Sequence, residues 1–180
     1  MEPTEHGPRT VHLRQRRRDP LEVPRVVVGV GESPSGTAAL AWAHQLCRSH
    51  GWRLDVVVAW PDLGEVPVHE IPGHYCLPRG RALAALHKAL AECGVETDGP
   101  MVRAYIENAD PVEALVDHSR GAAFLVVGRS GRGRSRGAGH DPMSELCVGR
   151  AQCPVVVVDS AAPLPREQSA RSTQLTGSRE

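Results

Sequence analysis

A segment rich in glycine and arginine contains the residues that are best suited to bind an anion. Residues 128–145 read GRSGRGRSRGAGHDPMSE and follow an apolar run. Glycines at the end of a strand let the backbone approach a phosphate, and guanidinium groups bind phosphate through paired hydrogen bonds. Gly128, Arg129 and Gly131 are therefore the candidate nucleotide contacts. Three further arginines follow in the same segment: Arg132, Arg134 and Arg136.

The end of the same segment argues against a phosphate site. Asp141 and Pro142 stand where a helix that binds phosphate needs small residues with free N–H groups. The Asp141 carboxylate can cap the helix itself and would repel a triphosphate, and Pro142 has no N–H to donate. We interpret Asp141-Pro142 as an ordinary helix start. The arginines could still hold an adenine nucleotide such as ATP, so this alternative stays open.

The elements that position these residues alternate along the chain. Short apolar runs predict five strands, at Arg25–Val30, Leu54–Trp60, Met101–Glu107, Ala123–Gly128 and Pro154–Asp159. Helices are expected between them, because Ser33 and Asp110 each precede a proline as helix caps do, and Gly51 stands where a helix would end. Strictly alternating strands and helices predict an α/β, doubly wound, five-stranded parallel sheet, in the order 3-2-1-4-5 along the chain numbering.

The predicted strand order places a crevice beside the glycine-rich segment. In such sheets the ligand lies beyond the carboxyl ends of the strands where the order reverses, here between the first and fourth strands. The loops leaving those two strands are GVGESPSG at residues 29–36 and the segment that begins at Gly128. We expect one folded domain over residues 24–159, with disordered arms at residues 1–23 and 160–180.

Several stretches resemble the universal stress protein family. VVVGVGESPSGTAALAWA, VVVAW, DPVEALVDHSRGAAFLVVGRSGRG and CPVVVV carry the likeness, which spans Arg25–Asp159. The resemblance implies a cytoplasmic, non-enzymatic sensor or regulator of a stress response that acts on a protein partner. It also implies a homodimer in which Val155–Val158 pairs with its copy, which would protect an apolar edge strand.

The chain departs from the pattern of the family members that bind ATP. In those members an aspartate ends the first strand, and the loop after the fourth strand reads glycine, two residues, glycine, nine residues, glycine, then Ser or Thr. Gly128 and Gly131 match, but Asp141 and Pro142 occupy the last two places. Gly31 replaces the aspartate, and a further glycine is replaced by Glu32. The resemblance therefore implies a degenerate nucleotide site, and we expect no bound cofactor of the usual kind.

Other chemistries find weaker support. Gly29 and Gly31 start a dinucleotide-binding pattern, but its third glycine falls on Pro34. His69, His74 and Cys76 are close together in sequence, but their spacing matches no common zinc site, so we expect no metal. Four serines in the crevice loops have only His140 near them in sequence, which gives no set of nucleophile, base and orienting group: Ser33, Ser35, Ser130 and Ser135. We therefore expect no enzyme.

Composition excludes further classes of protein. Lys and Arg number 21 and Asp and Glu also number 21, so no global charge favours nucleic acid. The basic run Arg14–Arg18 is nearly cancelled by nearby acidic residues and has no aromatic platform beside it, so we do not expect nucleic-acid binding. No apolar run is long enough to cross a membrane. Five cysteines without a C-x-x-C pair indicate reduced thiols in a cytosolic protein.

Overall fold

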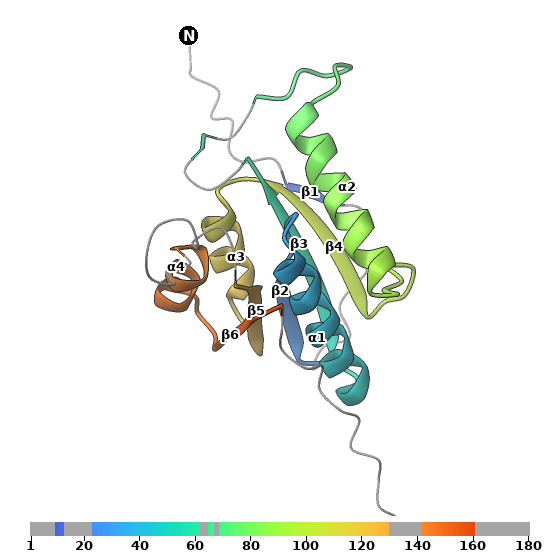
Figure 1. The fold of residues 1–180 in the computed structure, drawn as a ribbon, viewed down its shortest axis with the longest axis vertical. Helices are drawn as coiled ribbons and strands as arrows, with labels where there is room; N and C mark the ends of the chain where they lie inside the picture. The colour runs from blue at the N-terminus through green and yellow to red at the C-terminus, as the bar shows by residue number, and fades with distance from the viewer. Residues whose placement is uncertain (1–9, 13–22, 62–64, 67–68, 130–141, 161–180) are drawn as a thin grey trace, which may run out of the picture.

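The computed structural model describes residues 10–12, 23–61, 65–66, 69–129 and 142–160. A six-stranded sheet runs through the molecule in the order β1-β4-β3-β2-β5-β6 (Figure 1). Its strands are β1 (Thr10–His12), β2 (Arg25–Gly29), β3 (Arg53–Trp60), β4 (Val102–Asn108), β5 (Phe124–Gly128) and β6 (Val155–Val158). Strands β2 to β6 are parallel to one another, so the predicted five-stranded sheet and its order are confirmed.

One strand was not expected from the sequence. β1 pairs antiparallel with β4, with Thr10 opposite Glu107 and His12 opposite Tyr105. Sequence analysis placed these residues in a disordered arm over residues 1–23. Three residues are too short to show an alternating pattern, so nothing local marks them as a strand. Their pairing depends on the free edge of β4, which comes about 90 residues later in the chain.

Within the described ranges, four helices connect the parallel strands, and three of them begin at the prolines that the sequence marks, Pro34, Pro111 and Pro142. The four helices are α1 (Pro34–His50), α2 (Leu77–Glu92), α3 (Pro111–Ser119) and α4 (Pro142–Arg150). Ser33 caps α1, where its Oγ accepts a hydrogen bond from the Gly36 N–H at 3.2 Å. Asp110 caps α3, where its carboxylate accepts from the N–H groups of Val112 at 2.9 Å and Glu113 at 3.2 Å. Both caps satisfy donors that a helix start leaves free.

The helices cover the two faces of the sheet in pairs. α1 and α2 pack on the face that contains Val26 and Val28, whereas α3 and α4 pack on the face that contains Val27 and Leu125. Successive residues of a strand point to opposite faces, and both faces of β2 and β5 are buried. This explains why the sequences of these strands are continuous apolar runs rather than alternating ones.

Candidate functional site

The crevice predicted at the reversal of strand order lies between β2 and β5. These two strands are direct neighbours, with Gly29 opposite Val127. Their carboxyl ends therefore release the two loops that sequence analysis selected, one through Gly31 and Glu32 and the other through Arg129. Of the three candidate nucleotide contacts, Gly128 and Arg129 lie at this edge. Gly131, the arginines behind it and Asp141 lie outside the described residues.

Gly128 has a packing role that the sequence did not reveal. A Cβ atom added at this position would lie 2.4 Å from the carbonyl carbon and oxygen of Ser35 and 2.6 Å from the nitrogen of Gly36. These are backbone atoms of the first turn of α1, so they cannot rotate away as a side chain could. The end of β5 and the start of α1 therefore touch backbone to backbone. A glycine at position 128 is required by the fold, whatever the crevice binds.

The backbone of Arg129 is also engaged in the sheet. Its N–H donates a hydrogen bond to the Val158 carbonyl at 2.8 Å. This N–H extends the ladder between β5 and β6 and is not free to bind an anion. The Arg129 side chain is exposed. Of the two described candidate contacts, only the guanidinium of Arg129 remains available to a phosphate.

The start of α1 forms the other wall of the crevice, and its groups are largely bonded to one another. The Gly36 N–H lies 3.0 Å from the Ser33 carbonyl as well as 3.2 Å from its hydroxyl. The hydroxyls of Ser33 and Ser35 are 3.1 Å apart, and Pro34 has no N–H. A phosphate at this helix start would have to displace the Ser33 cap, so the first turn of α1 is a closed structure rather than an open cradle.

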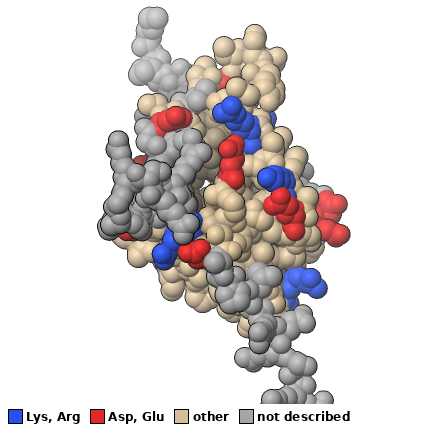
Figure 2. Space-filling view, viewed as in Figure 1, with Lys and Arg blue, Asp and Glu red and all other residues tan. Residues whose placement is uncertain are grey.

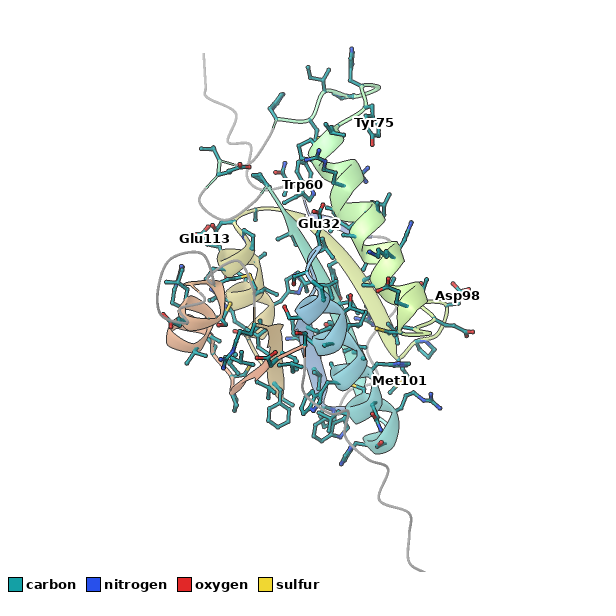
Figure 3. All side chains as sticks on the ribbon, viewed as in Figure 1. Glu32, Trp60, Tyr75, Asp98, Met101 and Glu113 are labelled. Atoms are coloured by element: carbon teal, nitrogen blue, oxygen red, sulfur yellow. The ribbon has the colours of Figure 1, made fainter. Side chains whose placement is uncertain are left out.

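The residues that leave β2 are open to solvent. Gly31 is exposed, and no atom lies within 4 Å of the position that its Cβ would take. Glu32 is also exposed and adds a carboxylate at the mouth of the crevice. A groove of about 650 Å³ begins at these two residues and extends toward α2, away from Gly128. Figure 3 shows Glu32 beside α2, near the point where α1 begins.

The family model of the universal stress proteins matches residues 22–159. The chain belongs to the universal stress protein family. Among curated relatives, universal stress protein Rv2623 of Mycobacterium tuberculosis is 31% identical over 151 residues, which cover 79% of this chain and 50% of that protein. Universal stress protein Rv2005c of the same species is 32% identical over 154 residues, which cover 81% of this chain and 51% of that protein. The chain thus spans about half the length of these curated relatives.

Solved structures of universal stress proteins share the fold. UspA from Lactobacillus plantarum superimposes with a TM-score of 0.57 and 18% identity, covering 75% of this chain and 97% of that chain. A universal stress protein from Archaeoglobus fulgidus in complex with dAMP superimposes with a TM-score of 0.54 and 19% identity, covering 77% of this chain and 98% of that chain. A universal stress protein in complex with cAMP superimposes with a TM-score of 0.51 and 22% identity, again covering 77% of this chain and 98% of that chain. At these identities the likeness shows the fold alone.

Three cysteines of this universal stress protein, Cys47, Cys93 and Cys153, have a raised thiol pKa. Burial, helped by the Asp55 carboxylate, raises the pKa of Cys47 to about 12. Burial also raises the pKa of Cys93 and of Cys153 above the usual value. Cys147 is fully buried between α4 and the sheet. Because the thiolate is the reactive form, Cys47, Cys93 and Cys153 do not have the properties of redox-sensor thiols.

The described residues contain no group of three or more His, Cys, Asp or Glu side chains that could hold a metal ion. His69, His74 and Cys76, whose sequence proximity raised the question of a zinc site, are among these described residues. No helix in the described ranges combines the length and apolar character needed to cross a membrane.

Proposed function

We propose that this universal stress protein is a non-enzymatic, cytoplasmic regulator or sensor of a stress response, with a degenerate nucleotide site. The observation that carries the proposal is the wall of the crevice formed by Gly31 and Glu32. Gly31 offers no side chain where ATP-binding members have an aspartate, and Glu32 places an exposed negative charge beside the space for a polyphosphate. The protein would act by binding a regulatory protein partner rather than by turnover.

Asp141-Pro142 supports the same proposal from the other wall. Asp141 lies outside the described residues, but α4 begins at Pro142 as the sequence predicts. An aspartate just before a helix caps its free N–H groups, as Asp110 does at α3. A carboxylate in this place would repel the phosphates that the family's Gly-Ser or Gly-Thr pair otherwise receives.

A second candidate function is the binding of an adenine nucleotide that lacks a triphosphate. Two structural neighbours are complexes with cAMP and with dAMP, each of which has a single phosphate. The departures at Asp141 and Pro142 affect the end of the family pattern, whereas Gly128 and Gly131 at its start are retained, with Arg129 between them. The Arg129 guanidinium, with the arginines that follow, would then bind the single phosphate.

Calorimetric titration with Mg-ATP tests the proposed loss of the usual site. We expect the wild-type protein to bind ATP with a Kd weaker than about 1 mM. The double variant Asp141→Gly/Pro142→Ser should bind measurably tighter, because it restores the free donors and removes the negative charge. Wild-type binding at a micromolar Kd, about −8 kcal/mol, would contradict the proposal. Binding of AMP or cAMP by a wild type that ignores ATP would favour the second candidate.

We further propose that the protein forms a homodimer through β6. This strand ends the sheet, and the sheet order gives it β5 as its neighbour on one side. On the adjoining helix α4, two large apolar side chains are exposed, Leu146 by 42% and Val148 by 58%. Figure 1 shows α4 beside β6 at the same side of the molecule. Antiparallel pairing of two β6 strands would extend the sheet and cover this apolar surface.

Replacing Val157 by proline should turn the dimer into a monomer. The carbonyls of Pro154 and Val158 accept hydrogen bonds from β5, so by the alternation of a strand the N–H of Val157 points outward. A proline there removes only a donor that faces the other subunit. Sedimentation equilibrium should give twice the chain mass for the wild type and the single mass for Val157→Pro. A monomeric wild type, or a dimeric variant that keeps its fold, would contradict this interface.

A further inference from the structure

The groove between α1 and α2 shares Gly31, Glu32 and Ser33 with the mouth of the crevice and extends from there along α2. Pro34 and Thr37 line it, whereas Ser35 and Gly36 contact the end of β5 at Gly128. Residues three apart on a helix share a face, so the groove lies on the opposite side of the first turn of α1. Beyond this shared mouth, the groove is lined by residues of α2 that take no part in the crevice, so a closed crevice does not imply that the groove is empty.

We propose that this groove binds a small zwitterionic molecule, with its positive group at Glu32 and its negative group at Arg81. The proposal does not rest on the proposed function of the crevice.

One continuous face of α2 forms the longer wall of the groove. Its lining residues are Arg81, Ala84, Ala85, Lys88, Ala89 and Glu92. This spacing of three and four residues places all of them along one stripe of the helix, about 16 Å long at 1.5 Å per residue. The three alanines give this wall small apolar side chains next to the charged ones, which suits a ligand with an aliphatic part. The groove has a volume of about 650 Å³ and is open to solvent along its length.

Among the described residues, the charges at the groove leave one group of each sign without an ion-pair partner. Lys88 and Glu92 lie 3.9 Å apart and compensate each other. Within the described residues, Glu32 and Arg81 form neither an ion pair nor a hydrogen bond. Figure 2 shows positive and negative side chains alternating down the face that lies over α2. An ATP-like polyanion would face the uncompensated Glu32 carboxylate, whereas a zwitterion would satisfy both free groups.

Linear ω-amino acids are suitable probes, because their two charges are held apart by an alkyl chain of adjustable length. We would titrate the full chain with ω-amino acids of about three to seven methylene groups and follow backbone amide shifts by NMR. We expect one chain length to bind best, with shifts at residues 31–37 and 81–92. The alkylammonium and alkanoate of matched length, which carry one charge each, should bind about tenfold more weakly. Equal binding of either singly charged analogue would overturn the proposal.

Charge variants at exposed positions test which residues hold the ligand. Glu32→Gln and Arg81→Gln should each weaken binding about tenfold, while Arg48→Gln, on an exposed position of α1 outside the groove, should leave it unchanged. The exchange Glu32→Arg/Arg81→Glu should restore binding, because a zwitterion can bind in the reverse direction. If no probe binds at up to about 10 mM, or if the exchange variant stays as weak as the single variants, the proposal is wrong.

Discussion

Replacing Gly128 by alanine should destabilise the domain by about 3 kcal/mol or more, a large effect for one methyl group. The added Cβ would lie 2.4 Å from the backbone of Ser35, far inside van der Waals contact. The obstructing atoms belong to the first turn of α1, which Ser33 holds through its cap. Relief therefore requires α1 to move away from β5 and to give up core contacts of Ala39 and Leu40. Chemical denaturation of wild type and variant measures the loss.

Gly31→Ala is the matched control on the other wall of the same crevice. Here the new methyl group would meet no atom within 4 Å, and the residue is exposed. We expect a change within about 0.5 kcal/mol. If Gly128→Ala proved as mild as Gly31→Ala, the close approach of β5 and α1 would be wrong. A large loss at position 128 alone would show that the first glycine of the loop is retained for packing, so its presence is weak evidence for a nucleotide.

Much of the fold could be predicted because its signals are local. Buried parallel strands appear as uninterrupted apolar runs, and Ser33 and Asp110 mark helix starts by the side chains that cap them. Strand boundaries differ from the predicted ones by about a residue, as at β4, where Val102–Asn108 replaces the expected Met101–Glu107. β1 escaped prediction because its only determinant is the distant edge of β4.

The candidate site was predicted only in its location. Strand order placed Gly128 and Arg129 at the crevice, but two contacts between distant segments decide what these residues can do. Gly128 meets the start of α1 about 90 residues earlier, and the Arg129 N–H is bonded to Val158. Neither contact can be predicted from the spacing of neighbouring residues in the sequence. Without them, a packing glycine and a ligand-binding glycine have the same appearance in the sequence.

The groove was missed for a related reason. The apolar residues of α2, Leu83, Leu86 and Leu90, recur at helical spacing and form the face that packs toward the sheet. The stripe that includes Arg81 and Lys88 reads as an ordinary solvated face when α2 is considered alone. It becomes the wall of a groove only because the loop after β2 brings Glu32 to it, about 50 residues away in the chain.

Replacing Asp55 by alanine should cost about 3 kcal/mol, because it leaves two arginines without their buried counter-charge. The Asp55 side chain is 1% exposed on β3 and lies 3.1 Å from the Arg25 guanidinium and 3.2 Å from Nε of Arg53. The two arginine side chains are themselves only 18% and 14% exposed, so water cannot fully replace the lost carboxylate. Urea denaturation at neutral pH gives the difference in unfolding free energy.

Two further variants separate lost charge from lost volume. Asp55→Asn keeps the size of the side chain, so a loss close to that of Asp55→Ala would assign the effect to charge. Asp117→Ala removes the ion-pair partner of Arg120 at the surface. The two groups are also 3.1 Å apart, but the Asp117 side chain is 69% exposed and the Arg120 side chain 65%. We expect that change to cost less than about 1 kcal/mol. Equal costs at positions 55 and 117 would mean that burial adds nothing to the pair. In that case, the ion pairs of Asp55 with Arg25 and Arg53 would not hold the amino ends of β2 and β3 together.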